Sequence, residues 1–335
     1  MPERINQSLE IVTAHVKKVL QYVLFLSIGV LLLYFTFKNT NPTELWNNIQ
    51  SVDRFGLFIA IGIGFIAIII RGIRWVQLLA SLGYKVSSAN AIAAVAFSYL
   101  VNLVTPRVGE VARCTAINRT DDVPIDKLFG TVVLERVVDT LMFGIILLIA
   151  VITQAQQLSI FLTQSGATLP SLSPTLISGL IVGGLLVLIG LWSTRKMWSQ
   201  WSFAQRVIGF IKGLVEGLRS IQKVDNKFLF WAYSVGIWTC YTATIVVGFK
   251  VVPGLEALGL SEAFYVSVAA GLGYVIPVPG GIGAYHYLVS KALTVIGYSP
   301  ELGTAYATII HSGNSLMFIA TGVIGMLILY FARKK

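Results

Sequence analysis

One segment of this chain, residues 276–285, interrupts a long apolar region in a way that excludes an ordinary helix. It reads Ile-Pro-Val-Pro-Gly-Gly-Ile-Gly-Ala-Tyr. Its helix-breaking residues are Pro277, Pro279, Gly280, Gly281 and Gly283. Proline lacks the backbone N–H that a helix needs, and glycine adopts conformations that are closed to other residues. The apolar stretches on either side, 264–275 and 287–296, are each too short to span a bilayer.

This broken segment needs protein around it, because irregular backbone at membrane depth is tolerated only where protein covers it or where it lines a wet cavity. Residues 262–298 are therefore predicted to form a re-entrant pair of half-helices. A similar break occurs earlier, where Pro106 and Gly109 end the apolar run 89–104. Two interrupted segments at corresponding places in two halves are typical of an inverted-repeat transport site.

The composition of the chain places it in a lipid bilayer. Of its 335 residues, 56% are hydrophobic and 12% are charged, and the mean hydropathy is +0.78. A soluble domain carries roughly 25% charged residues. We therefore expect an all-α polytopic membrane protein in which residues 1–335 form a single integral membrane domain.

The net charge of +10 has a topological explanation. Cytoplasmic loops of membrane proteins carry an excess of Lys and Arg, so this charge does not predict nucleic-acid binding. Anionic headgroups of membrane phospholipids are the natural counter-charge and the expected partners. The two cysteines and three histidines are too few and too scattered to predict a metal site, and no cofactor is expected. The sequence leaves open whether the chain forms a homo-oligomer.

Hydropathy and loop charge together predict six transmembrane helices plus two re-entrant broken-helix pairs. The six spans are expected at residues 19–37, 55–70, 128–152, 172–192, 228–252 and 307–331. Residues 89–118 are interpreted as re-entrant, because a full span at 89–104 would place the arginines that follow that run outside the cell. Those arginines are Arg107, Arg113 and Arg119.

The loops predict the orientation of the chain. Residues 153–171 carry no charge, which suits an outer loop, whereas 195–227 are strongly basic and are expected in the cytoplasm. Apolar residues recur at helical spacing in 195–227, which predicts an amphipathic helix, either on the membrane surface or packed on the bundle. Both termini are then cytoplasmic in a bacterial cytoplasmic membrane. The halves 19–152 and 172–331 run oppositely, as in inverted-topology repeats.

Two groups of charged residues lie within or at the ends of predicted spans. Arg71 and Arg74 are three residues apart and share a helix face. The favoured interpretation is a pair of snorkelling arginines at the membrane surface, and the alternative is a clasp for a lipid phosphate.

The second group is Glu135, Arg136 and Asp139. Glu135 and Asp139 share a helix face, and Arg136 is placed to pair with Asp139. Charges inside a span are costly and by default mark a functional site, although a structural ion pair is the competing interpretation.

Four segments in order carry a resemblance to a known family. They are Arg71-Gly-Ile-Arg-Trp75, Thr105-Pro-Arg-Val-Gly-Glu-Val-Ala-Arg113, Glu135-Arg-Val-Val-Asp139 and Pro277-Val-Pro-Gly-Gly-Ile-Gly283. The chain from about residue 20 to 330 resembles the lysylphosphatidylglycerol synthetase transmembrane-region family, the flippase-like domain of the bacterial multiple peptide resistance factor. The resemblance implies a lipid-handling fold and, in the best-known member, translocation of aminoacylated phosphatidylglycerol.

Two departures limit what the resemblance implies. No soluble aminoacyltransferase domain is recognised in the sequence, so lipid aminoacylation is not expected. The family usually has Glu three residues after the last glycine of the fourth segment, and His286 occupies that place here. The change from carboxylate to imidazole argues against a direct transfer of the family's substrate.

The leading hypothesis from the sequence is a lipid translocase with a polar cleft between the two broken elements. The groups expected to attract the phosphate are Arg107, Arg113 and Arg136, and those expected to balance them or meet a cationic headgroup are Glu110, Glu135 and Asp139. Half-helix N-termini near residues 280–283 would add backbone donors, and His286 is the candidate proton-coupling group. The competing classes are an intramembrane enzyme with Glu110 or His286 as general base, and a scaffold without turnover.

Overall fold

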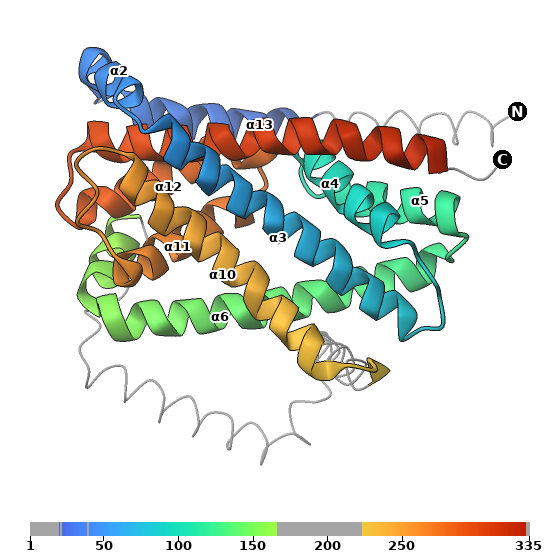
Figure 1. Cartoon of the computed structure of the whole chain (residues 1–335). Coiled ribbons are helices and arrows are strands. Elements are labelled where there is room, and N and C mark those ends of the chain that lie inside the picture. The colour runs from blue at the N-terminus through green and yellow to red at the C-terminus, as the bar shows by residue number, and fades with distance from the viewer. Residues whose placement is uncertain (1–19, 21, 39, 166–222, 333–335) are drawn as a thin grey trace, which may run out of the picture.

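The computed structural model describes residues 20, 22–38, 40–165 and 223–332, and this part of the chain consists of helices and their connections (Figure 1). The predicted fourth span at 172–192 and most of the basic segment 195–227 lie outside the described residues. The helices are Tyr22–Phe37, α2 (Pro42–Gln50), α3 (Arg54–Ala80), α4 (Ser88–Val104), α5 (Gly109–Asp121), α6 (Ile125–Gln164), α10 (Lys227–Val251), α11 (Leu260–Val275), η2 (Pro279–Gly281), α12 (Ala284–Val295) and α13 (Pro300–Ala332).

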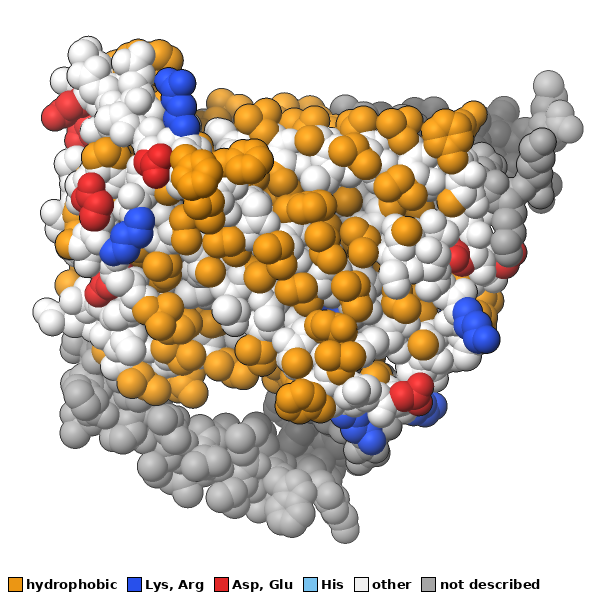
Figure 2. Space-filling view, in the orientation of Figure 1, with side chains coloured by type: hydrophobic (Ala, Val, Ile, Leu, Met, Phe, Trp, Pro, Cys, Tyr) orange, Lys and Arg blue, Asp and Glu red, His pale blue; other side chains and the backbone are white. Residues whose placement is uncertain are grey.

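Four of these helices, α3, α6, α10 and α13, are long and apolar enough to cross a membrane. Tyr22–Phe37 and α2 supply a fifth candidate if this pair, bent by 94°, counts as one span. Figure 2 shows hydrophobic side chains covering the middle of one face, with charged side chains gathered toward its two ends. The chain is thus a polytopic helical membrane protein, and the number of six spans stays a prediction.

Two helices extend further than the sequence predicts. α3 continues past the expected end at residue 70 to Ala80, because Arg71 and Arg74 are buried rather than interfacial. α6 runs for 40 residues, so residues 153–164, expected in an outer loop, are helical. It bends at Gln154, whose side-chain amide donates to Ser261 Oγ at 2.6 Å and to a carboxylate oxygen of α11. This stretch lacks Pro and Gly, so nothing ends the helix there.

α3 and α10 lie side by side and run in opposite directions (Figure 1). At one end the N–H of Asp53 donates to the carbonyl of Val251 at 3.1 Å, and at the other Arg74 donates to Ser234 Oγ at 3.0 Å. The predicted span at 228–252 is therefore confirmed as a helix, and it is fixed against α3 between Ser234 and Val251.

The two predicted breaks both form hairpins of short helices. The first hairpin is α4, residues 105–108 and α5; the second hairpin is α11, residues 276–283 with η2, and α12. α4 packs antiparallel on α13, where Gly325 faces Ala93 and the rings of Tyr99 and Phe318 stack at 4.7 Å. Small residues at such crossings let helices approach closely in membranes.

The second hairpin packs on α6 in a similar way. Phe143 of α6 lies against Gly271 of α11, and Gln154 near the far end of α6 reaches Ser261 at the start of α11. α6 and α11 are therefore antiparallel, as α13 and α4 are. Whether either hairpin is re-entrant depends on where the bilayer lies, and that part stays a prediction.

Candidate functional site

Five charged side chains from three helices meet inside the bundle, and we call them the charge cluster. Its members are Arg71 and Arg74 of α3, Arg113 of α5, and Glu135 and Asp139 of α6. Each residue has no more than 9% of its surface exposed. The local sequence explains the convergence, because Arg71 and Arg74 are one helical turn apart and so are Glu135 and Asp139.

Every carboxylate oxygen of the cluster accepts a hydrogen bond from a guanidinium. Asp139 Oδ2 lies 2.7 Å from Arg71, and its Oδ1 lies 3.0 Å from Arg74. Glu135 Oε2 lies 2.5 Å from Arg113, and its Oε1 lies 3.4 Å from Arg74. Arg74 therefore bridges both acids and ties the two turns of α6 to α3.

Polar and aromatic neighbours complete the cluster. Arg71 donates to the hydroxyl of Tyr241 at 3.4 Å, and that hydroxyl lies 3.2 Å from the hydroxyl of Tyr99 on the first hairpin. The guanidinium of Arg113 sits 4.6 Å from the ring centre of Trp75, whose indole N–H donates to the side chain of Thr131 at 2.8 Å. The long helices α3, α6 and α10 and the first hairpin are thus joined at one place.

The charge cluster contains more positive than negative charge. Three guanidiniums face two carboxylates, which leaves one positive charge in excess. In addition, the Nε atoms of Arg71, Arg74 and Arg113 are buried and have no hydrogen-bond partner. Buried donors without partners are rare because each costs about 1–3 kcal/mol. An anion would supply both the missing negative charge and the missing acceptors.

These contacts correct two interpretations made from the sequence. Arg71 and Arg74 do not snorkel to the membrane surface, because Asp139, which is 68 and 65 residues away from them along the chain, binds both inside the bundle. Arg136 does not pair with Asp139; it points away from the cluster and binds Glu110 at the start of α5. Glu135 and Asp139 do share a helix face, as predicted, and the buried network that they form includes Arg113 but not Arg136.

The first break brings its own charged residues to the surface of the bundle. Arg107 adopts a left-handed backbone conformation with φ of 65° and donates to the carbonyl of Val275 at 3.3 Å. Glu110 keeps one buried carboxylate oxygen, Oε2, without a partner. Neither residue belongs to the charge cluster, so the charged residues predicted for the site separate into the buried cluster and a group nearer the surface of the bundle.

The second break has the irregular backbone that its glycines predict. Gly280, Gly281 and Gly283 have φ values of 59°, 76° and 86°, a region that residues with a Cβ avoid. Two histidines contact the backbone of this break. His311 Nε2 lies 2.9 Å from the carbonyl oxygen of Gly280. His286 Nδ1 accepts a weak hydrogen bond from the N–H of Gly283 at 3.4 Å. Pro277 and Pro279 flank this turn, and Pro279 begins η2.

The two imidazoles contact each other, with ring centres 4.6 Å apart. The sequence names His286 as a candidate and gives no reason to select His311, because 25 residues and a helix boundary separate them. The sequence also gives no reason to choose the hydroxyl groups of Ser234, Tyr99 and Tyr241, because a lone hydroxyl in an apolar helix carries no sequence signal. Within the described ranges, no group of three or more His, Cys, Asp or Glu residues is placed to hold a metal ion.

The two breaks lie against each other, as the sequence predicts. Arg107 reaches from the first break to the end of α11, and Leu103 at the end of α4 faces Gly280 of the second break. The helix Tyr22–Phe37 covers this junction, because a Cβ on Gly283 would collide with the carbonyl oxygen of Gly29. The junction and the charge cluster are linked through Tyr99 of α4, which contacts Tyr241.

This fold and site define a polytopic helical membrane protein in which two broken hairpins flank a buried arginine–carboxylate network. The chain belongs to the lysylphosphatidylglycerol synthase TM region family, whose model matches residues 20–325. Among curated proteins it is similar to glycosyltransferase AglD of Haloferax volcanii, with 24% identity over 322 residues, which cover 86% of this chain and 51% of that protein.

A UPF0104 membrane protein of Methanocaldococcus jannaschii is 32% identical over 78 residues, which cover 22% of this chain and 23% of that protein. The chain thus spans about half the length of the first relative and a smaller share of the second. No solved structure gives a significant match. The family and these relatives point to a membrane protein of lipid- or glycolipid-related processes.

Proposed function

We propose that this protein is a lipid translocase that moves a phospholipid, or another lipid-linked anionic substrate, across the membrane between its two broken hairpins. The observation that carries the proposal is the charge cluster, with one excess positive charge and three buried Nε donors that lack partners. A phosphate supplies what these groups lack, because it is anionic and accepts several charge-assisted hydrogen bonds. Polar groups that cross hydrocarbon without such partners cost several kcal/mol each.

The arrangement of the two halves supports an inverted repeat. In the first half, α6 follows the first hairpin, and in the second half α13 follows the second hairpin. Each hairpin packs its first helix antiparallel on the long helix of the other half: α4 on α13, and α11 on α6. Such exchange between halves gives the reciprocal packing expected of repeats that rock around a central site.

The charge cluster is enclosed in this structure, since none of its five residues has more than 9% of its surface exposed. Transport therefore requires the first hairpin to move away from α6 and α3, so that guanidiniums exchange a carboxylate for the phosphate. The carboxylates released in this exchange neutralise an ammonium group where the headgroup carries one. In this proposal the exposed ion pair of Glu110 and Arg136 stands at the start of the path.

Transport is placed ahead of catalysis because every oxygen of Glu135 and Asp139 is bound by a guanidinium. Glu110, whose Oε2 has no partner, and His286 remain the general-base candidates of the competing enzyme class. His286 is held at the second break by the backbone of Gly283 and by the ring of His311. The name of the glycosyltransferase relative makes a lipid-linked saccharide the second substrate class to test.

The experiment reconstitutes the purified protein in vesicles that contain fluorescent phosphatidylglycerol, and a membrane-impermeant quencher counts the inner and outer pools over time. The wild type should move the lipid faster than protein-free vesicles do. Arg71→Gln should slow the movement at least about tenfold, which corresponds to about 1.4 kcal/mol in the barrier. Arg54→Gln, an exposed change at the other end of the same helix, is the matched control. Equal rates for wild type and Arg71→Gln would show that the cluster is not on the path.

We propose both termini on the cytoplasmic side of a bacterial cytoplasmic membrane, and the end of α6 outside. The free cysteines Cys114 and Cys240 are first replaced by Ser, and a single Cys is placed at Ser165, at the C-cap of α6. Impermeant maleimide should label this position only from outside. Labelling only from the cytoplasm would reverse the topology.

A further inference from the structure

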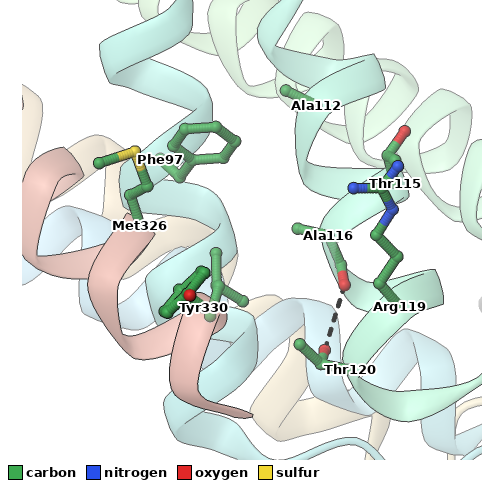
Figure 3. A pocket seen from close by; sticks show the side chains of 9 residues that line it. Phe97, Ala112, Thr115, Ala116, Arg119, Thr120, Met326 and Tyr330 are labelled. Carbon is green, nitrogen blue, oxygen red and sulfur yellow. Dashed lines mark hydrogen bonds between the residues drawn. The ribbon is translucent and has the colours of Figure 1, made fainter. Parts of the chain in front are cut away.

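A groove separate from the charge cluster lies between the first hairpin and the C-terminal end of α13 (Figure 3). Its volume is about 350 Å³, within the roughly 300–1,000 Å³ typical of sites for small molecules. Its lining residues are Phe97, Ala112, Thr115, Ala116, Arg119, Thr120, Met326, Leu329 and Tyr330. α5 separates this groove from the cluster, since Arg113 on the same helix turns inward to Glu135.

The walls of the groove are apolar, and one edge carries a cation. Figure 3 shows Phe97, Met326 and Tyr330 on one side and the small side chains of Ala112 and Ala116 on the other. The two threonine hydroxyls of α5 donate to carbonyls of their own helix, so they are not the groups that would hold a ligand.

Arg119 is the charged residue of this groove, which we call the Arg119 groove. Its side chain is exposed, and it forms no ion pair with any residue in the described part of the chain. An arginine fork is suited to a phosphate, because it can donate two parallel hydrogen bonds.

The depth of the Arg119 groove matches the shape of a phospholipid. Arg119 lies in the last turn of α5 and Tyr330 lies in the last turn of α13. The start of α4 lies beside them, and there the carboxylate of Asp121 accepts hydrogen bonds from the backbone N–H of Ser87 and the side-chain amide of Asn90. This end of the bundle is therefore polar. The groove runs from Arg119 back to Ala112, about 10 Å at roughly 1.5 Å per residue, into the apolar part of the bundle.

We propose that the Arg119 groove binds one anionic phospholipid, with its phosphate on Arg119 and the start of an acyl chain against Phe97 and the alanines of α5. Charge selects the headgroup and the apolar walls select the chain, so neither a free phosphate nor a neutral lipid satisfies the whole site. Tyr residues near helix ends commonly sit at headgroup level, which agrees with Tyr330 at the rim. This site does not depend on translocation by the charge cluster.

The test uses dioleoyl phosphatidylglycerol that carries a photoactivatable diazirine in one acyl chain, added to the purified full-length protein in detergent. After illumination, labelled peptides are identified by mass spectrometry. Labelling is expected on the peptides around Phe97 and Met326. Arg119→Gln should reduce this labelling at least fivefold, and Ala116→Trp, which fills the groove, should abolish it. Arg54→Gln, at the end of α3 opposite to the groove, should leave the labelling unchanged.

Three competitors and one further variant decide between sources of the signal. Unlabelled phosphatidylglycerol should compete, whereas dioleoyl phosphatidylcholine and inorganic phosphate should not. Thermal unfolding in detergent checks that Ala116→Trp is folded, and Arg119→Gln carries the conclusion if it is not. If Arg119→Gln labels like the wild type, or if phosphatidylcholine competes equally, the groove is only an apolar surface and the proposal is wrong. If Arg71→Gln and not Arg119→Gln removes the label, the lipid belongs to the charge cluster; the inference then fails while the proposed translocation stands.

Discussion

The two hairpins have the same construction and are stabilised by different chemistry. In each, a short helix ends at a proline-containing break and a second short helix starts at or just after a glycine, Gly109 or Gly283, whose Cβ would collide with a carbonyl oxygen. The first hairpin is fixed by charge, through Arg113 on Glu135. The second is fixed by backbone conformation and by the imidazoles of His286 and His311.

Because of this difference in chemistry, the two hairpins are suited to different parts of the proposed translocation. Ion pairs inside a bundle are costly to separate but can exchange one anion for another, whereas glycines at positive φ and tight backbone contacts have no such alternative partner. Under the proposed translocation, the first hairpin would handle the charged headgroup and the second hairpin would hold the shape of the junction. The following predictions test that division.

The largest effect is expected for Glu135→Ala, which leaves Arg74 and Arg113 buried without this carboxylate. Loss of one partner of a buried pair costs about 3–5 kcal/mol. The unfolding temperature in detergent should fall sharply. Glu135→Ala combined with Arg113→Ala should be milder than the sum of the two single changes, because the second change removes a stranded charge. Strict additivity would mean that the two residues do not interact.

The same logic applies to Asp139, with a partner that only the structure identifies. Asp139→Ala should couple to Arg71→Ala, since their side chains lie 2.7 Å apart. It should be additive with Arg136→Ala, because Arg136 binds Glu110 instead. Both double-mutant cycles are read from unfolding in detergent, and coupling to Arg136 in place of Arg71 would contradict the arrangement of α6.

A smaller effect is expected for Gly283→Val at the second break. The new Cβ meets the oxygen of Gly29, and the φ of 86° adds strain of about 1–3 kcal/mol. The helix Tyr22–Phe37 should be displaced, which limited proteolysis would detect. Gly297→Ala is the matched control, because its φ of 101° brings strain while its Cβ would meet nothing within 4 Å. Pro279→Ala should be milder than Gly283→Val, since it adds no bulk.

A still smaller effect is expected for His311→Phe. The ring contact with Tyr285, at 5.1 Å between centres, can be kept, but the hydrogen bond to the Gly280 carbonyl is lost. That bond contributes about 1 kcal/mol. Thermal unfolding should show this loss, and lipid movement in vesicles should fall less than tenfold. A larger fall in transport than in stability would give the second hairpin a part in handling the substrate.

The smallest effect is expected for Arg136→Gln, which removes an exposed ion pair with Glu110. Exposed pairs contribute about 0–1 kcal/mol and are screened by salt. The unfolding temperature should change little in about 150 mM NaCl, where the screening length is roughly 8 Å. A loss as large as that of Glu135→Ala would place Arg136 in the buried network.

Local features of the fold could be predicted from the sequence, and distant pairings could not. The breaks at Pro106 and Pro277 are set by residues within a few positions, so both hairpins were predictable. The partner of Arg71 is 68 residues away, and its identity depends on the register of α3 against α6. Hydropathy alone cannot provide that register, which is why snorkelling is the simpler interpretation of an arginine beside a Trp.

The ends of long helices were also hard to predict from apolar runs. Residues 153–164 look like an outer loop because they lack charge, yet α6 continues through them and bends where Gln154 bonds to α11. Of the candidate residues, the cluster members were recognised as unusual charges, but which of them pair was decided by tertiary contact. His311 gave no sign in the sequence, because its role comes from a carbonyl 31 residues away.

The bridging position of Arg74 has a consequence for how the chain enters the membrane during synthesis. Arg74 emerges from the ribosome 65 residues before Asp139, so α3 reaches the insertion machinery while its counter-charges do not yet exist. An arginine at the centre of a lone helix costs about 2.5–3.5 kcal/mol to insert, and Arg74, nearer the C-terminal end of α3, costs less than that but still lacks its partners. The C-terminal part of α3 is therefore expected to wait at the surface until α6 arrives, which makes the two helices a single unit of insertion.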